Sequence, residues 1–241
     1  MQQVPSKEVY VKDVGLNRFF TRVYSYMGLG IAISALISFL ALNTFRDQYS
    51  QLLQEHPMTL WILFIAEIAM VFGFRATQRR STAINLALFA SFAAINGLVL
   101  SVTLSFYNIA DITTAFVTAA ALFVALAIVG FVTKRNLSRM GQMSMALLIG
   151  LILASVINLF MQSSFMQLIL SYVGVLIFSM LTAYDNQYLK GVYYQSVNRG
   201  DLSADVSLNN IAVMGALNLY LDFINIFLYI LQIFGFDTQN N

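Results

Sequence analysis

Seven long apolar runs divide the chain, and they constrain its fold more than any other feature. They lie near residues 23–43, 58–75, 82–106, 113–133, 144–162, 165–188 and 210–235. Each run is close to the ~20 residues that a helix needs to cross the ~30 Å hydrocarbon core of a bilayer. Only 10% of the residues are charged, against about 25% in an ordinary soluble domain. The sequence therefore predicts an all-α, polytopic membrane protein with seven transmembrane helices.

The polar segments between the runs are short, and the weakest break, MQSSF, separates the runs 144–162 and 165–188. We expect two helices joined by a tight turn there rather than one re-entrant hairpin, because each run is nearly long enough to span alone. The first run has no clear small-residue cleavage site, which argues against a cleaved signal peptide. The expected organisation is an N-terminal arm over 1–22, a single transmembrane domain over 23–235 and a short tail over 236–241.

Lysine and arginine are distributed unevenly among the polar segments. Of the 13, all but Arg46 precede or open the first run, or follow the second, fourth or sixth run. Seven spans place these 12 residues on one side of the membrane, and the positive-inside rule makes that side cytoplasmic. We therefore predict a cytoplasmic N-terminus and an external C-terminus.

Several classes of protein are excluded by single residue types. Cysteine is absent and His56 is the only histidine, so disulfides, thiolate chemistry and multi-histidine metal sites are excluded. The net charge of +2 is too small for a basic face that binds nucleic acid. No lysine lies in the middle of a run, which argues against bound retinal, and the runs lack the GxSxG motif of many serine hydrolases. We expect no enzymatic activity and no cofactor.

Three acidic residues lie inside the apolar runs, where an ionisable group costs a few kcal/mol. Glu67 lies in the middle of IAEIAMVFGF, Asp185 near the end of the run 165–188, and Asp222 near the middle of the run 210–235. Burying a charge in the membrane costs more free energy than an uncharged hydrogen bond between helices, so we expect a functional role for Asp222 above all. For Glu67 two explanations stay open: a functional acid, or a protonated side chain that is hydrogen-bonded to a neighbour.

Asp222 shares one helix face with other polar side chains. Asn218, Asp222, Asn225 and Tyr229 follow the spacing i, i+4, i+7, i+11. Polar stripes with helical spacing also occur in the two preceding runs, at Ser171, Gly174, Thr182 and Asp185 and at Ser155, Asn158 and Gln162. Lipid has no hydrogen-bond partner for such side chains, so these stripes are expected to face the interior of a bundle and to join its helices.

Four stretches resemble the transmembrane Bax-inhibitor-motif family, and its bacterial branch in particular. The most specific is GALNLYLDFINIFLYILQIFG, from Gly215 to Gly235, which is similar to the C-terminal signature of the family. The resemblance extends from about Arg18 to Phe236. The other three stretches are NGLVLSVTLSFY (Asn96–Tyr107), TKRNLSRMG (Thr133–Gly141) and GVLIFSMLTAYDNQYLK (Gly174–Lys190).

This resemblance implies a fold and a function. The last of seven helices would be surrounded by the others, in the inner membrane of a bacterium. The protein would be a pH-sensitive calcium leak, with an aspartate on each of the last two helices as its latch, and the matching residues are Asp185 and Asp222. In the family an arginine near the end of the second helix pairs with the latch. Arg79 is the preferred match, and Arg75 and Arg80 compete with it.

The resemblance also leaves alternatives. Glu67 matches an acid in the second helix of calcium-conducting relatives, which makes it a candidate pathway residue. Other members are linked to regulation of membrane proteases or of cell death, so a non-transporting regulator that binds another membrane protein stays open. A proton-coupled transporter of a small solute stays open too, because buried acids also relay protons. The expected partners are lipid, calcium ions, protons and, for a regulator, a second membrane protein.

The chemistry of the two aspartates suits such a latch. Calcium prefers about 6–8 oxygen ligands, and a weak site suits a leak. The side chains expected to supply oxygens are Asp185, Asp222, Asn218 and Asn225. Two carboxyl groups in a low dielectric cannot both ionise easily, so we expect them to share a proton that holds the helices together. Because Asp185 lies close to Lys190, at the end of its run, we also expect a helix tilt or a break near Gly215 to bring the pair level.

Overall fold

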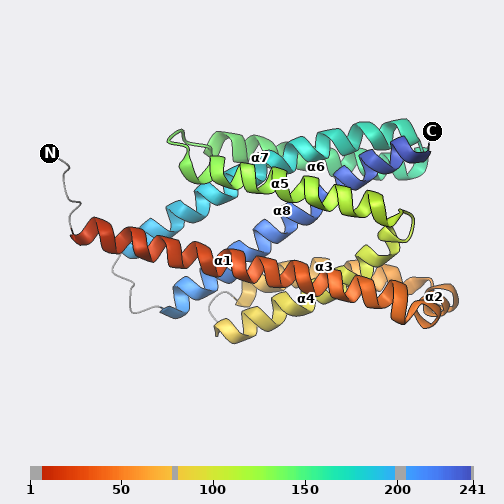
Figure 1. The fold of residues 1–241 in the computed structure, drawn as a ribbon, viewed down its shortest axis with the longest axis horizontal. Coiled ribbons are helices and arrows are strands. Elements are labelled where there is room, and N and C mark those ends of the chain that lie inside the picture. The colour runs from red at the N-terminus through yellow and green to blue at the C-terminus, as the bar shows by residue number, and fades with distance from the viewer. Residues whose placement is uncertain (1–6, 78–80, 199–204, 240–241) are drawn as a thin grey trace. The chain divides into compact units, whose positions relative to one another are not determined.

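The computed structural model describes residues 7–77, 81–198 and 205–239, with side chains over 14–74, 81–198 and 208–236 (Figure 1). Every regular element in these ranges is a helix. The elements are α1 (Lys7–Phe39), the short π-helix η1 (Leu40–Thr44), α2 (Arg46–Glu55), α3 (Met58–Thr77), α4 (Thr82–Leu104), α5 (Ile109–Val132), α6 (Ser138–Met161), α7 (Ser164–Asn198) and α8 (Asp205–Gln239).

Six helices in the described ranges are long and apolar enough to cross a membrane. They are α1 continued by η1, α4, α5, α6, α7 and α8. Helix α2 and the described part of α3 qualify together as a seventh, with a bend of 97° between them. This confirms the prediction of a polytopic helical bundle.

Helix α1 begins well before the first apolar run. It extends without a break from Lys7 to Phe39, through the junction that the sequence pattern placed after residue 22. The reason is amphipathicity: Leu16, Phe19, Phe20 and Val23 are buried, and polar residues separate them. The polar face lowers the average hydropathy of this part of α1, so it does not stand out as an apolar run in the sequence.

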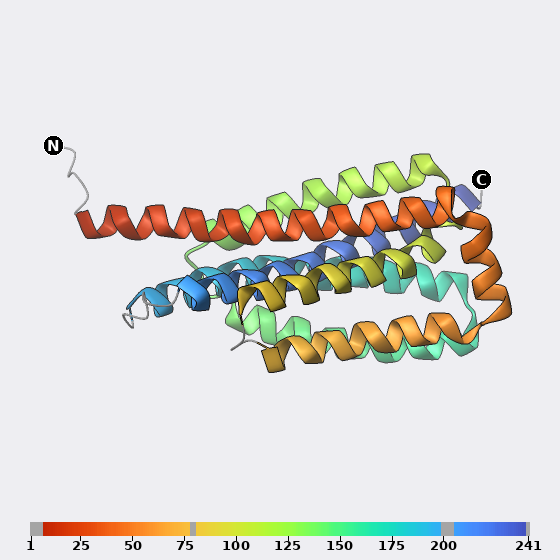
Figure 2. The same ribbon diagram turned by 90° about the horizontal axis from the view of Figure 1, so that it is seen from below.

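Helix α2 was not expected from the sequence, which showed only a polar segment between the first two runs. Figure 2 shows it turning between the end of η1 and the start of α3. None of its ten residues is buried. The hydroxyl of Tyr49 holds it in place by donating a hydrogen bond of 2.9 Å to the carbonyl oxygen of Leu98 in α4.

The chain folds as two compact units. The first contains the described residues up to Phe106 together with 192–198 and 205–217, and its helices α1 and α4 lie in close contact. Ser34 and Ser38 of α1 donate hydrogen bonds of 2.7 and 2.6 Å to the carbonyl oxygens of Ala93 and Gly97 in α4. Small side chains at this interface allow the backbones to approach, as is common in membrane bundles.

Replacing Gly97 by alanine should destabilise the first unit. A Cβ atom at Gly97 would lie 2.7 Å from the backbone oxygen of Ser34, which cannot move aside as a flexible side chain can. We expect Gly97→Ala to lower the free energy of unfolding by ~1–3 kcal/mol, the usual cost of overpacking. Thermal unfolding in detergent, followed by circular dichroism, measures the change. Gly150→Ala in α6 is the control, because a Cβ there meets nothing within 4 Å, and equal destabilisation of both variants would contradict the prediction.

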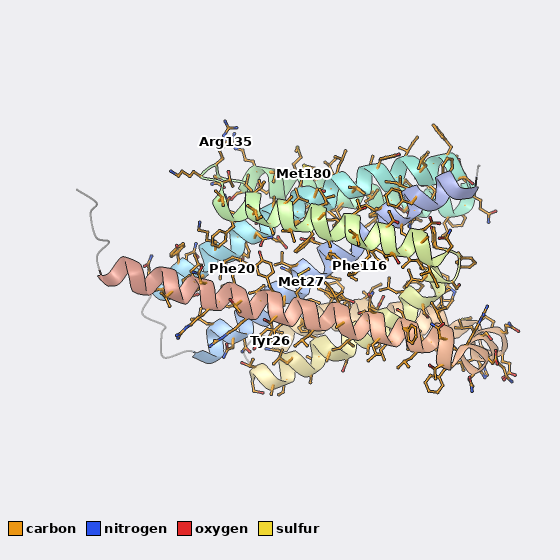
Figure 3. All side chains as sticks on the ribbon, in the orientation of Figure 1. Phe20, Tyr26, Met27, Phe116, Arg135 and Met180 are labelled. Carbon is orange, nitrogen blue, oxygen red and sulfur yellow. The ribbon has the colours of Figure 1, made fainter. Side chains whose placement is uncertain are left out.

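The second unit contains residues 107–191 and the described part of α8 from Asn218. The side chain of Gln187 in α7 fixes the loop between α5 and α6: its amide oxygen accepts from the backbone N–H of Leu137 at 2.7 Å, and its amide nitrogen donates to the carbonyl of Arg135 at 2.7 Å. The side chain of Arg135 itself extends outward from this loop (Figure 3). Lys190 donates to the carbonyl of Phe131 at 2.9 Å and lies over its ring.

The chain turns sharply between α6 and α7, as predicted from the weak MQSSF break. Helix α6 ends at Met161 and α7 begins at Ser164, and both are long enough to span. Gln162 makes the turn with a positive φ of 50°, a left-handed conformation. Two helices rather than one re-entrant hairpin therefore occupy the runs 144–162 and 165–188.

Helix α8 is the most enclosed of the candidate spans in the described ranges. Inside its apolar window 67% of the residues are buried, against 17–39% in the other five single-helix spans. This burial explains why polar residues can be accommodated along α8.

Candidate functional site

The two aspartates of the predicted latch lie in the second unit, on α7 and α8. Asp222 is 5% exposed, and Asp185 is half-buried. Their carboxyl groups are close enough to interact electrostatically. The structure therefore brings together the two acids that the sequence placed in different apolar runs.

Thr182 of α7 is the third member of this site. Its side chain is fully buried, and its hydroxyl lies within hydrogen-bonding reach of the Asp222 carboxyl. The hydroxyl also donates to the carbonyl oxygen of Phe178 at 2.8 Å. A hydroxyl has one hydrogen, so Thr182 can donate either to this carbonyl or to the Asp222 carboxyl, and it can also accept a hydrogen bond from a protonated Asp222.

One oxygen of Asp222 has no donor. Its Oδ2 atom is buried and makes no hydrogen bond to any described residue. A buried oxygen that carries negative charge without a donor is costly, whereas a protonated carboxyl needs less compensation. The local geometry thus suits a carboxyl group that holds a proton.

The two aspartates interact without a break in α8. The sequence placed Asp185 near the end of its helix, but α7 continues past Lys190 to Asn198, so Asp185 lies well inside it. Helix α8 is continuous from Asp205 to Gln239, and the break expected near Gly215 does not exist. The error arose because the last turns of α7, KGVYYQSVN, are polar and do not count toward an apolar run.

Aromatic side chains close the surroundings of Asp222. Phe223 packs edge-on against Phe116 and Phe123 of α5, with ring centroids 5.5 and 5.8 Å away, and Figure 3 shows Phe116 on α5. About two turns further along α8, the ring of Tyr229 lies against Gly174 of α7, where a Cβ atom would come within 2.5 Å of it. These contacts pack α8 against α5 and α7 along the part of the helix that carries Asp222.

The amides predicted to support the aspartates are placed differently. Asn218 is exposed on α8. Asn225 is half-buried and donates a hydrogen bond of 2.8 Å to the carbonyl of Leu221 in its own helix. No hydrogen bond joins either amide to Asp185 or Asp222, so the shared face of α8 did not by itself identify the ligands of the site.

Glu67 lies apart from the pair in the sequence, in the first unit. Its Oε1 atom accepts a hydrogen bond of 2.8 Å from the amide of Asn96, which joins α3 to α4. A hydrogen-bonded neighbour was one of the two explanations open for Glu67. Its role as a pathway acid stays a prediction.

The arginine expected to pair with the latch cannot be placed. Arg79 and Arg80 lie outside the described residues, and the side chain of Arg75 lies outside the described side chains. Over the side chains that are described, neither Asp185 nor Asp222 forms an ion pair. The pairing with Arg79 therefore stays a prediction.

Two further polar residues of α7 were not singled out from the sequence. Asn186 is fully buried and donates to the carbonyl of Thr182 at 2.8 Å, and Gln187 fixes the preceding loop. The sequence did contain a signal for these two residues, because they belong to the polar cluster DNQ inside an apolar helix. Over the described ranges, no group of three or more His, Cys, Asp and Glu side chains comes together as a metal site. A calcium ion at the pair would need most of its oxygen ligands from carbonyl groups and water.

The fold and the site define a class: a polytopic helical membrane protein with a buried acidic pair on its last two helices. Comparison with known sequences agrees. The profile of the family described as inhibitor of apoptosis-promoting Bax1 matches residues 16–239. The chain is 36% identical over 237 residues to the inner membrane protein YbhL of Escherichia coli strain K12, which covers 98% of this chain and 99% of YbhL.

Two other relatives are similar over nearly their whole length. An uncharacterized membrane protein of Streptococcus pyogenes serotype M3 is 42% identical over 223 residues, covering 92% of this chain and 94% of the relative. The uncharacterized protein YrjE of Lactococcus lactis is 40% identical over 226 residues, covering 94% of both chains. The chain belongs to the Bax inhibitor family and is an integral membrane protein.

Proposed function

We propose that the protein is a pH-sensitive leak for calcium or similar cations, with Asp185 and Asp222 as its latch. The observation that carries this proposal is the pairing of two acids on adjacent helices in a buried site where one carboxyl oxygen lacks a donor. Such an arrangement is costly for a protein that needs only to hold helices together. It suits an element that changes its packing when a proton leaves.

The proposed cycle follows from charge. With one proton between them, the carboxyl groups attract each other and hold α7 against α8. When that proton leaves, two like charges repel each other in a low dielectric, and the helices separate. Thr182 interacts with Asp222, and the phenol of Tyr184 interacts electrostatically with Asp185. The proposal assigns no enzymatic activity and no cofactor, with calcium bound weakly in transit.

Liposomes that contain only this protein test the proposal. Passage of calcium into liposomes loaded with an indicator dye supports a leak. Proton uptake that requires a co-transported small solute identifies a transporter instead. Absence of both fluxes in correctly folded, reconstituted protein identifies a non-transporting regulator that acts by binding another membrane protein, and it would refute the leak.

We further propose that the protein resides in a bacterial inner membrane with its N-terminus in the cytoplasm and its C-terminus outside. The support is the distribution of lysine and arginine, 12 of 13 of which fall on one side of a seven-span topology. A reporter that is active only in the cytoplasm should therefore be inactive when fused after Asn241. The same reporter fused before Met1 is the control and should be active. Activity at the C-terminal fusion would overturn this topology.

A further inference from the structure

A pocket of about 560 Å³ with a mixed polar and apolar lining lies in the second unit, at the turn between α6 and α7 and beside the C-terminal part of α8. It is distinct from the aspartate pair, because Gln232 in its wall is about 15 Å along α8 from Asp222. Four amides, three serine hydroxyls and the phenol of Tyr107 line it, and none of the described side chains in its wall is charged. A volume of this size is typical of small-molecule sites and far exceeds the ~30 Å³ of one water molecule.

Three of the amides form a hydrogen-bonded chain of fixed direction. The backbone N–H of Ser163 donates to Oδ1 of Asn158, the amide nitrogen of Asn158 donates to Gln167, and that of Gln167 donates to Oε1 of Gln232 at 2.8 Å. Since a backbone N–H can only donate, it fixes which atom of each following amide is oxygen. The chain ends at the NH₂ group of Gln232, which has no acceptor among the described residues.

Gln162 supplies the fourth amide from an unusual backbone position. Its φ of 50° lies in the left-handed region, where glycine and asparagine are favoured. Its side chain is exposed and makes no hydrogen bond to a described residue, so internal contacts do not explain why glutamine stands there. A left-handed residue is a common helix ending, and here it ends α6 with the amide of Gln162 in the pocket wall.

Two aromatic rings complete the wall. The ring of Tyr107 lies against Gly235 of α8, where a side chain larger than hydrogen would collide with it. Burial raises the pKa of the Tyr107 phenol, so the group stays protonated at neutral pH and can both donate and accept. Phe236 is the second ring, and an aromatic face suits the C–H surface of a ligand.

The pocket lies beside surface that suits lipid. Leu159, Phe160, Met161 and Phe165 at the turn are between 60% and 83% exposed. Large exposed apolar side chains on a membrane protein are expected to contact lipid, so the mouth of the pocket is expected at the level where headgroups meet water.

We propose that this pocket binds an uncharged, hydroxyl-rich group, namely a sugar, either free or as the headgroup of a glycolipid. The absence of charged side chains in the described wall disfavours an anion held by ion pairs. The free NH₂ groups of Gln232 and Gln162 disfavour a bare cation, which needs oxygen ligands. Sugar hydroxyls both donate and accept, and so match the mixture of amides, hydroxyls and aromatic faces. This inference does not depend on the proposed leak.

The chain contains no cysteine, so a single reporter can be attached cleanly. Leu159→Cys at the pocket wall, labelled with an environment-sensitive dye, is reconstituted in phosphatidylcholine nanodiscs from a detergent without a sugar headgroup. One arm titrates free maltose, and the other adds glucosyl-diacylglycerol to the nanodiscs. We expect a saturable change in at least one arm. A response to maltose indicates a free sugar as ligand, and a response to the glycolipid alone indicates a headgroup.

Two variants in the labelled background test the assignment. Gln162→Gly removes an amide while suiting the left-handed backbone, and Gln232→Leu removes the end of the amide chain. Each is expected to weaken binding about tenfold, the effect of losing one good hydrogen bond, while Gln51→Ala on α2 is the control and should leave affinity unchanged. Thermal unfolding shows that each variant is folded. The proposal is overturned if folded wild-type protein responds to neither probe, or if calcium chloride alone gives the saturable response and Gln162→Gly abolishes it.

Discussion

Replacing either aspartate of the pair by asparagine is expected to flatten the pH dependence of the calcium leak. In the wild-type protein, flux should rise as the pH increases, because the pair loses its shared proton and the two charges then repel. A repulsion of only ~1.4 kcal/mol changes the ratio of open to closed protein tenfold. Asp185→Asn and Asp222→Asn keep the size of the side chain but remove one ionisable group, so the repulsion cannot develop. Calcium flux into liposomes, measured across roughly pH 5–8, is the relevant assay because perturbed carboxyl groups titrate in this range.

The control for this experiment is an acid of the same type outside the site. Asp47 is exposed in the first turn of α2, and Asp47→Asn should leave the profile unchanged. If Arg79 stabilises the ionised pair, its replacement by glutamine should move the midpoint of the profile to higher pH. An identical pH profile in the wild type and in both pair variants would remove the latch and leave the acids as structural groups.

The helical class and the approximate positions of the apolar helices could be predicted from the sequence, because the bilayer requires a long apolar segment for each span. Helix ends that extend beyond the apolar layer could not be predicted in this way. Helix α1 begins at Lys7 and α7 ends at Asn198, both in polar sequence, and apolar side chains in the adjoining described turns, such as Phe19 and Tyr193, are buried against protein. The residues that follow Asp185 show the consequence of this error, since the misplaced end of α7 led to the expectation of either a helix tilt or a break near Gly215.

The candidate site could be predicted in part. The cost of burying an acid, together with the family resemblance, identified Asp185 and Asp222, and helical spacing correctly put Thr182 on the same stripe as Asp185. Spacing alone could not show that Asn218 is exposed, since it gives a shared face but not what covers that face. Gln232 continues the stripe of Asp222 and Tyr229 at helical spacing, so the amide chain at the far end of α8 left a signal in the sequence. Its partner Gln167 is neutral and distant in sequence, and the pairing became visible only in the fold.

Asp222→Asn is expected to change calcium flux far more than Glu67→Gln. Glu67 already shares a hydrogen bond with Asn96, and glutamine keeps an oxygen that accepts from that amide, so the contact between α3 and α4 survives. We expect calcium flux through the Glu67→Gln variant to stay within about twofold of the wild type, because the hydrogen bond with Asn96 is retained. Asp222 has an oxygen without a donor and a second acid beside it, so its neutralisation removes the source of the repulsion.

The comparison is made at the alkaline end of the pH range, where the wild-type pair is ionised and the expected difference is largest. There Asp222→Asn should reduce flux about tenfold, the change that corresponds to removing ~1.4 kcal/mol of repulsion. Glu67→Leu separates structure from conduction: it breaks the contact with Asn96 and should lower the melting temperature while leaving the shape of the pH profile intact. If Glu67→Gln abolished flux and Asp222→Asn left it unchanged, the acid of α3 and not that of α8 would control the pathway.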